Sequence, residues 1–313
     1  MNTSAIIVTY NPPSEFCENL YHWRNQLDQV VIIDNGSTPE IREVFQQAIR
    51  EKMGNIEFIL NDTNLGIATA LNQSFARLIH QGSNLVFVFD QDSQPAPDMV
   101  RTILNTFYSH PKREQIAIVA PMIEDPDAGI TYSFLRSRGR FLFERTRSAS
   151  QVLEDVSIVI TSGALYNLDA YQKIGPFRDD FFMDYIDTEY CLRARQNGYT
   201  IVVNCNALLY HHLGNQQKRR LGPLTMRPTF HSPLRWYYIS RNRVPMFLLY
   251  AFRFPYWFLY ELMINTFGLV RLLLFEDHKF RKILAILLGT LDGLRKQMGP
   301  ASDSRKNLFV VQE

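Results

Sequence analysis

The chain has 313 residues, of which 46% are hydrophobic and 20% are charged, so it is globular and not intrinsically disordered. Its formal net charge is only +2, but residues 235–313 hold 12 Lys and Arg against 6 Asp and Glu, whereas residues 1–234 hold 21 against 25. The length fits one large domain, or one domain with an appendage.

Short apolar segments alternate with helical patterns through the first 120 residues. Buried strands are predicted at 5–10, 30–33, 56–60, 85–89 and 116–120. Helices are predicted between them at 14–26, with Ser14 as the N-cap, and near 39–52, 67–81 and 97–108. This alternation predicts βαβ units and therefore an α/β fold with a mostly parallel sheet flanked by helices.

The middle of the chain is less regular. Residues 124–155 are polar and rich in arginine, and we expect them to be irregular. Strands are predicted at 157–165, 200–204 and 207–210. A helix begins at Asp187 or Thr188 and ends at Gly198.

The C-terminal region combines apolar, aromatic and basic residues. Only Arg253, Glu261 and Arg271 are charged within 244–275, and the longest uncharged runs there are nine residues. A membrane-spanning helix needs about 18. A second stretch, 283–294, is apolar on one side and has basic residues at both ends. We therefore expect helices that lie on a membrane surface. A helical tail packed on the catalytic domain, or on a second subunit in a homodimer, is the alternative.

Two further features bear on the partners and the compartment. The basic charge could suit nucleic acid or an anionic membrane surface, and we expect the membrane and no nucleic acid. Cys17, Cys191 and Cys205 show no metal spacing and are odd in number, which fits free thiols in a reducing compartment. The short apolar stretch 5–8 is not typical of a signal peptide, so we expect no export.

Asp90-Gln91-Asp92 directly follows the predicted strand at 85–89. Ligands of open α/β sheets bind at the carboxyl ends of strands. Paired carboxylates suit Mg²⁺ or Mn²⁺, which often bridges to substrate phosphates. A solvated turn is the other explanation, because Ser93-Gln94-Pro95 follows.

Six motifs in order across residues 4–215 resemble the inverting glycosyltransferases of family 2. They are Ile7-Val8-Thr9-Tyr10-Asn11, Asp34-Asn35-Gly36-Ser37, Asn64-Leu65-Gly66, Asp90-Gln91-Asp92, Thr161-Ser162-Gly163 and the helix start at Asp187. The resemblance implies a GT-A fold, with a catalytic domain at 1–234 and a C-terminal helical region at 235–313 that associates with a membrane. The form Phe-Asp-Gln-Asp-Ser at 89–93 is most similar to bacterial rhamnosyltransferases that use dTDP-L-rhamnose.

The resemblance implies a set of donor-binding residues. They are Thr9, Tyr10, Asn11, Asp34, Asn35, Asn64, Gly66, Asp90 and Gln91. Asp34 would accept a hydrogen bond from the imide N–H of the pyrimidine, and the loop with Gly66 precedes a helix N-terminus, which favours anions. A tight turn at Asn35-Gly36 and helix capping by Thr63 or Asn64 are the alternatives.

The resemblance also assigns the metal and the diphosphate. Asp92 would be the principal metal ligand, with Asp90 nearer the ribose or bound through water. His211 would contact the metal or the diphosphate; otherwise it is a surface histidine or one whose ring bonds to the backbone. Arg219, Arg220 and Arg241 would bind the diphosphate, since guanidinium groups suit phosphate oxygens. Lys218, Arg219 and Arg220 could equally form a solvated basic loop.

Asp187 is the expected catalytic base. An inverting transfer needs a carboxylate that takes the proton of the acceptor hydroxyl. Family members usually have Glu-Asp here, whereas this chain has Ile186-Asp187. Asp184 and Glu189 compete for the role, and Asp187 could be only a helix N-cap.

The implied enzyme is an inverting, metal-dependent rhamnosyltransferase of bacterial surface polysaccharide (O-antigen) synthesis. It would use dTDP-β-L-rhamnose and act on a glycan or undecaprenyl-linked oligosaccharide at the inner face of the cytoplasmic membrane. The same mechanism with UDP-hexose or UDP-HexNAc is the nearest alternative. A metal-dependent phosphohydrolase would explain neither Asp34 nor Asp187, and a non-enzymatic scaffold would not need both carboxylate sites.

Overall fold

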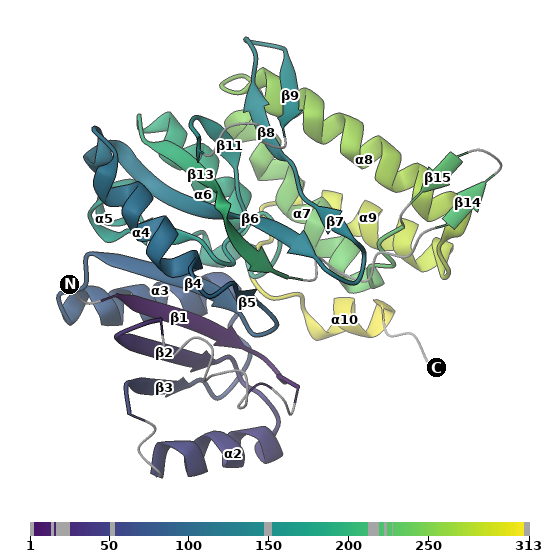
Figure 1. Cartoon of the computed structure of the whole chain (residues 1–313). Coiled ribbons are helices and arrows are strands. Elements are labelled where there is room, and N and C mark those ends of the chain that lie inside the picture. Colours follow the sequence, from purple (N-terminus) through teal and green to yellow (C-terminus); the bar gives the residue numbers. More distant parts are fainter. Residues whose placement is uncertain are drawn as a thin grey trace. The chain divides into compact units, whose positions relative to one another are not determined.

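The computed structural model describes residues 3–13, 16, 26–50, 54–146, 152–211, 219–221, 224–226 and 228–309 (Figure 1). The chain divides into two compact units. The first comprises Met1–Arg136, Arg145–Asp179 and Asp187–His212, and the second comprises Ser137–Glu144, Asp180–Ile186 and Leu213–Glu313.

A large, mostly parallel sheet forms the first unit. Its strands are β1 (Ser4–Thr9), β2 (Gln29–Asp34), β3 (Ile56–Leu60), β4 (Leu85–Asp90), β5 (Gln94–Pro95), β6 (Ile116–Asp125), β7 (Ile130–Thr131), β10 (Val152–Leu153), β12 (Leu165–Asn167) and β13 (Thr200–Tyr210). The order is β10-β13-β6-β12-β4-β1-β2-β3, with β5 paired to β13 and β7 to β6. The strands β4, β1, β2 and β3 are parallel, and β12 is antiparallel to both of its neighbours.

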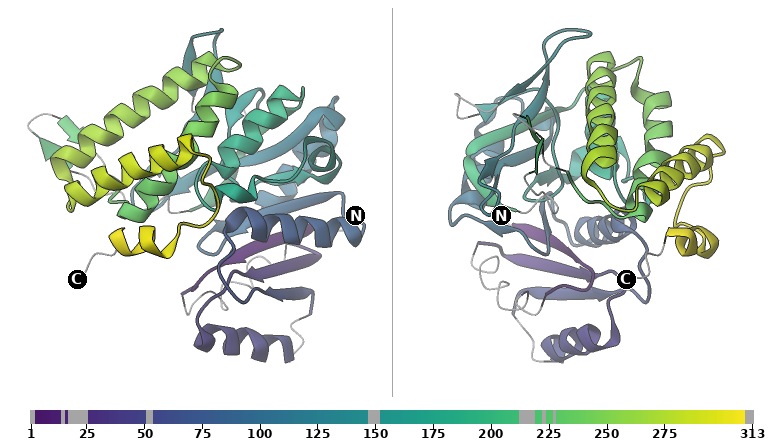
Figure 2. Two further views of the ribbon diagram at one scale, coloured as in Figure 1. Left: turned by 180° about the vertical axis from the view of Figure 1, so that it is seen from behind. Right: turned by 90° about the vertical axis from the view of Figure 1, so that its right-hand side faces the viewer.

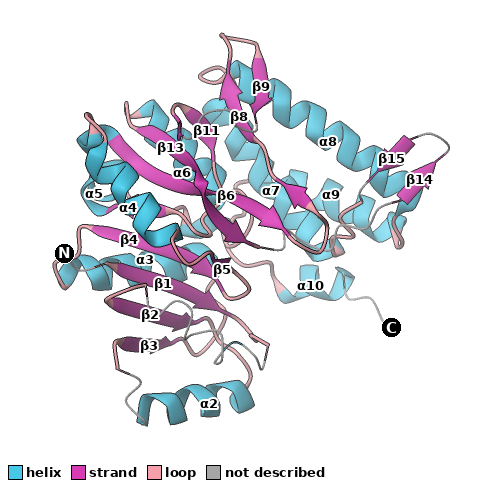
Figure 3. Ribbon diagram, in the orientation of Figure 1, coloured by secondary structure: helices cyan, strands magenta, loops and turns pink. Residues whose placement is uncertain are grey.

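Helices cover this sheet (Figure 3). They are α2 (Pro39–Arg50), α3 (Ile67–His80), α4 (Met99–Ser109), α5 (Leu168–Ile174) and α6 (Ile186–Gln196), with short 3₁₀ turns η1 (Arg113–Gln115) and η2 (Asp179–Phe181). α2 packs against β3, α3 against β1 and β2, and α4 against β6 and β13. Because the inner strands have both faces covered, their sequences are nearly continuous apolar runs, as in β2 and β4.

The predicted α/β class is confirmed, and three predicted segments differ. Residues 157–165 form no single strand: β11 (Val156–Ile158) and β12 are separated by a turn in which Gly163 has a φ of 75°. The region 124–155, expected to be irregular, contains β7, β10, β8 (Phe134–Ser137) and β9 (Phe143–Thr146). Strands 200–204 and 207–210 are one strand, β13, with an irregularity between Asn204 and Leu208. Most of the helix predicted at 14–26, including Ser14, lies outside the described residues.

The second unit is mainly helical. Its helices are α7 (Pro233–Tyr250), α8 (Pro255–Phe275), α9 (Lys279–Leu294) and α10 (Asp303–Phe309), and a small hairpin is formed by β14 (Arg219–Leu221) and β15 (Leu224–Met226). α7 packs against both α8 and α9, as Figure 2 shows from two sides. Ser232 caps α7 by accepting a hydrogen bond from the backbone N–H of Arg235. The predicted boundary at 234/235 falls within this unit, which also includes 137–144 and 180–186.

α8 is longer and more apolar than its uncharged runs suggested. Its 21 residues are enough, by length and composition, to cross a membrane. This corrects the expectation, drawn from uncharged runs of nine residues, that no segment here is long enough to span a membrane. The helix meets the length and mean hydropathy of a membrane span although it contains the isolated charges of Glu261 and Arg271. Only 17% of the apolar window is buried within the structure.

Glycine allows α7 and α9 to approach closely. A Cβ at Gly289 would clash with the backbone carbonyl of Tyr237, and one at Gly293 would lie 2.5 Å from the carbonyl oxygen of Arg241. In α8, by contrast, a Cβ at Gly268 would meet the Trp236 ring at an ordinary 3.5 Å.

We therefore expect Gly289→Ala to destabilise the chain by about 1–2 kcal/mol, because overpacking outweighs the gain in helix propensity. Gly268→Ala is the matched control, and it should leave stability unchanged or raise it by up to about 1 kcal/mol. Urea denaturation of both variants measures the difference. Equal stability of the two variants would contradict the close approach of α7 and α9.

Candidate active site

The polar residues predicted from the motifs lie at the carboxyl ends of parallel strands. The pairing of β1 with β2 sets Thr9 beside Asp34, and the pairing of β1 with β4 sets Val8 beside Asp90. The three strand ends therefore share one edge of the sheet, where ligands of open α/β sheets bind.

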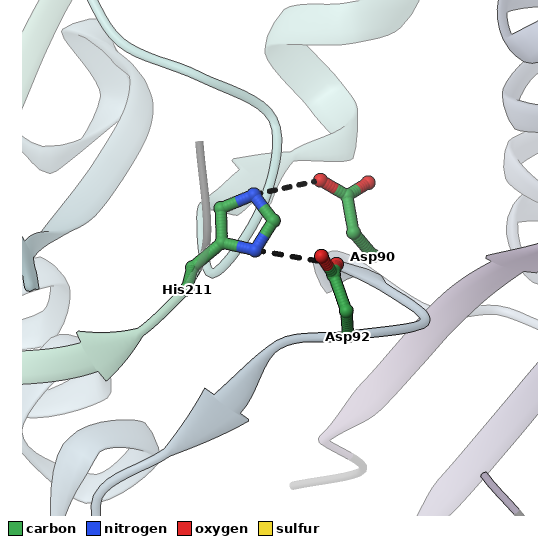
Figure 4. A group of neighbouring side chains, drawn as sticks. All are labelled: Asp90, Asp92 and His211. Carbon is green, nitrogen blue, oxygen red and sulfur yellow. Dashed lines mark ion pairs between the residues drawn. The ribbon is translucent and has the colours of Figure 1, made fainter. Parts of the chain in front are cut away.

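Asp90, Asp92 and His211 converge at this edge (Figure 4). The Nε2 of His211 lies 3.3 Å from Oδ2 of Asp90, and its Nδ1 lies 3.3 Å from Oδ1 of Asp92. One ligand atom from each residue lies within 4.8 Å of the others. Asp92 is exposed and Asp90 is partly exposed, so further ligands can reach the cluster. Two carboxylates and one imidazole therefore fit a divalent cation such as Mn²⁺ or Mg²⁺.

The pKa values of Asp90 and His211 depend on the charges of their neighbours in the cluster. Burial, and then the neighbouring charge of Asp92, raise the pKa of Asp90, while His211 and the hydroxyl of Ser162 act in the opposite direction. Burial alone would lower the pKa of His211, but the hydrogen bond to Asp92 and the charges of Asp90, Asp92 and Asp125 raise it overall. Without a metal, the imidazole of His211 is the partner that both carboxylates share.

Two buried serines support the cluster. Ser93 Oγ lies 2.5 Å from Ser162 Oγ and 3.3 Å from Nδ1 of His211, and Ser162 Oγ also accepts the backbone N–H of Asp90. Sequence reasoning gave neither serine a role. Their positions, directly after Asp92 and inside the turn that precedes β12, were visible, but only the fold shows that they meet.

Asp34 is fully buried at the end of β2. Its carboxylate accepts hydrogen bonds from the Ser37 backbone N–H at 3.0 Å, from the Ser37 hydroxyl and from Thr9 Oγ1 at 3.2 Å. These bonds fix the turn after β2, because a buried carboxylate needs its hydrogen bonds satisfied. The expected bond from a pyrimidine imide to Asp34 stays a prediction.

An amide network joins two loops beside this turn. The Nδ2 of Asn35 donates to Oδ1 of Asn64 at 3.1 Å, and Oδ1 of Asn35 accepts from Asn61 and from the Leu65 backbone. Gly36 has a φ of 83° and no room for a Cβ against Thr63. The tight-turn alternative is therefore part of the structure, and Asn35 is buried.

Tyr10, Asn11 and Gln91 remain at the surface of the same edge. The backbone N–H of Tyr10 donates to Oε1 of Gln91 at 2.9 Å, and the Tyr10 ring is 48% exposed. Asn11 has a positive φ of 46°, and its Oδ1 accepts a hydrogen bond from the backbone N–H of Thr38. Exposed Asn64 accepts the backbone N–H of Gly66 at 2.9 Å. These groups form the accessible part of the predicted nucleotide site.

Asp187 lies in the first turn of α6 and is partly exposed. Its Oδ1 accepts the backbone N–H of Thr188 at 2.6 Å. Both competitors are engaged elsewhere: Glu189 is buried in an ion pair with Arg193 at 2.9 Å, and Asp184 pairs with Arg235 at 3.1 Å. The role of Asp187 as the base stays a prediction.

Arg241 does not fit its predicted role at a diphosphate. It is fully buried in the second unit, and its guanidinium donates to the backbone carbonyls of Phe181, Asp180 and Gly299. Burial lowers its pKa. The side chains of Arg219 and Arg220, and all of Lys218, lie outside the described residues.

The family model of glycosyl transferase family 2 matches residues 4–175. Over 307 residues, which are 94% of this chain and 96% of the relative, the chain is 26% identical to dTDP-rhamnosyl transferase RfbF of Shigella flexneri. The mannosyltransferase PcManGT of Pyrobaculum calidifontis, solved with GDP-Man and Mn²⁺, shares the fold at a TM-score of 0.54 and 13% identity, over 98% of this chain and 78% of that one. GalNAc-T7, solved with UDP, GalNAc and Mn²⁺, has a TM-score of 0.55 and 14% identity, over 77% of this chain and 47% of that one.

We expect Mn²⁺ affinity to rise with pH through the raised pKa of His211, because the proton and the metal compete for the same imidazole. The raised pKa of His211 also affects stability. Protonated His211 stabilises the metal-free chain at low pH, and this stabilisation is lost as the pH rises through the raised pKa. His211→Gln should weaken Mn²⁺ binding by at least about tenfold and flatten its pH dependence.

Calorimetric titration over a series of pH values tests this expectation. His110→Gln is the matched control, since His110 pairs with Glu154 outside the cluster. Unchanged Mn²⁺ binding by His211→Gln would remove His211 from the ligand set.

Proposed function

The chain belongs to glycosyl transferase family 2, and from that membership we propose that it transfers L-rhamnose from dTDP-β-L-rhamnose to a glycan acceptor with inversion. The observation that carries the choice of rhamnose is the similarity to a dTDP-rhamnosyl transferase along nearly the whole of both chains. Asp90, Asp92 and His211 form a group that could hold a metal ion, which supports a metal-dependent donor site.

The proposed reaction is a single displacement. The acceptor hydroxyl attacks the anomeric carbon, the bond from that carbon to the diphosphate oxygen breaks, and Asp187 takes the hydroxyl proton. A β-linked donor then gives an α-L-rhamnoside. A carboxylate within hydrogen-bond reach of the acceptor is the expected base in such a step.

Asp92, Asp90 and His211 would hold Mg²⁺ or Mn²⁺. When bound, the ion would neutralise charge that develops on the departing dTDP. Tyr10, Asn11, Asn64 and Gln91 are the accessible groups at the nucleoside end, and the exposed ring of Tyr10 offers a face for the thymine base.

The proposed acceptor is a lipid-linked, undecaprenyl-type oligosaccharide of bacterial surface polysaccharide (O-antigen) synthesis. The chain would then work on the inner face of the cytoplasmic membrane, held there by its C-terminal helices. The exposed apolar side chains of α8 and the net positive charge of residues 235–313 support this location. A UDP-hexose or UDP-HexNAc donor would keep the same mechanism.

The donor is identified by calorimetric binding of dTDP-L-rhamnose, UDP-glucose, UDP-GlcNAc and GDP-mannose, with and without Mn²⁺. We expect binding of dTDP-L-rhamnose that is selective and needs the metal. Asp92→Asn should lose the metal-dependent part of the affinity, because it removes a charged ligand. Tighter binding of another nucleotide sugar would overturn the assignment of rhamnose.

Asp187→Asn should lower the transfer rate by about 10²–10⁴ and leave donor binding intact, because only the proton acceptor is removed. Asp169→Asn is a matched control, since Asp169 is an exposed carboxylate in the first turn of α5. Radiolabelled transfer to a membrane extract measures both variants. Full transfer by Asp187→Asn would show that another group is the base.

A further inference from the structure

A basic pocket lies in the second unit where two loops far apart in the sequence meet. One wall comes from the tip of the β8–β9 hairpin, with Ser137, Gly139 and Arg140. The other comes from the turn between α7 and α8, with Phe252 and Arg253, and from Tyr256 at the start of α8. The pocket has a volume of about 440 Å³ and no acidic side chain lines it. We call this pocket and the hairpin tip the arginine corner.

Large apolar side chains protrude around the pocket. Phe252 is 93% exposed, and on the hairpin tip Leu142 is 67% and Phe141 is 57% exposed. Such protruding side chains cost free energy in water, so they indicate a surface that is covered in the working protein.

The arginine corner has a fixed shape. Arg138 donates its backbone N–H to Leu142 at 2.9 Å and its side chain pairs with Glu144 at 2.7 Å. Phe143 packs edge-on against Tyr260 of α8, with ring centroids 5.4 Å apart. Figure 1 shows β9 beside the beginning of α8. Because Glu144 is already paired, the guanidinium groups of Arg140 and Arg253 have no carboxylate partner among the described residues.

An apolar stripe on α8 continues from this corner. Its exposed members fall on one side of the helix, and they are Leu259, Leu262, Met263, Phe267, Leu269, Val270, Leu273 and Leu274. The stripe and the corner together form a surface with apolar side chains along a helix and arginines at one end.

We propose that the arginine corner docks on a bilayer of anionic phospholipid, with Arg140 and Arg253 holding a headgroup phosphate. Phe141, Leu142 and Phe252 then enter the interface between headgroups and acyl chains, and α8 lies along the surface on its apolar stripe. The inference rests on the membrane association proposed above and assigns to it a binding site and a lipid class.

Charge and shape together favour a bilayer over a second copy of the chain. Guanidinium groups bind phosphate oxygens well, and anionic lipid attracts each arginine near its surface by about 1 kcal/mol. A protein partner would need an acidic, concave surface to receive rings that protrude this far. A fluid interface accepts protruding aromatic side chains without such a match.

The test is co-sedimentation of the full chain with vesicles of phosphatidylcholine alone or mixed with phosphatidylglycerol. We expect binding to the anionic vesicles, and a loss of about thirtyfold in affinity for Arg140→Gln/Arg253→Gln, which is about fivefold for each charge. Phe141→Ser/Phe252→Ser should weaken binding to both vesicle types. Both pairs of side chains are exposed, so the fold should not change.

Arg101→Gln/Arg113→Gln is the matched control, because it removes the same charge from exposed positions of the first unit. It should bind the anionic vesicles almost as the wild type does. Equal losses in the two double variants, or no vesicle binding by the wild type together with dimer formation, would overturn the proposal. Calorimetric donor binding is measured in solution on the same variants, so a failure of the docking surface is distinguished from a failure of the proposed transferase.

Discussion

The active edge depends on the repulsion between Asp90 and Asp92, two carboxylates one residue apart at the end of β4. Their proximity is tolerated because His211, at the end of β13, lies 3.3 Å from each of them. A histidine far from them in the sequence thereby links β4 to β13. The same arrangement is what a divalent cation needs, since a proton on the imidazole and a bound ion neutralise the same two charges.

Much of this edge was predictable from local sequence. Apolar runs that end in Asp34 and Asp90 identify strands, and the alternation with helices makes those strands parallel, so their polar ends must meet. The family was identified by resemblance, because several of the motifs quoted for it lie at these strand ends. What a strand end does not reveal is whether its carboxylate faces solvent. The carboxylate of Asp34 accepts hydrogen bonds from Ser37 and Thr9 within the protein, whereas Asp92 is exposed.

The errors arise where a residue's partner is distant in the sequence. Arg241 sits in an aromatic and basic stretch that resembles a phosphate-binding wall, yet it is buried against carbonyls about 60 residues away. The periodicity of residues 235–250 does not indicate that Arg241 is buried or which carbonyls it contacts. The segment 157–165 was predicted as one strand for a similar reason. Residues 158–160 and 164–165 are apolar, but Thr161, Ser162 and Gly163 between them form a turn, and a Cβ at Gly163 would meet Pro121 and Leu209.

The burial of Arg241 shows that the C-terminal helices have a structural role that does not depend on a membrane. Residues 180–186 contain three non-glycine residues with positive φ, namely Phe182, Asp184 and Tyr185, and each costs about 1–3 kcal/mol. Such a backbone persists only if something holds it. Asn242 donates to the carbonyls of Phe181, Met183 and Asp184, and Arg241 donates to two carbonyls of the same segment. This segment runs directly into Ile186 and Asp187 at the start of α6. The inner face of α7 thus holds the segment that leads into α6, where the proposed base Asp187 lies. The face of α8 that we propose to meet a lipid surface is exposed.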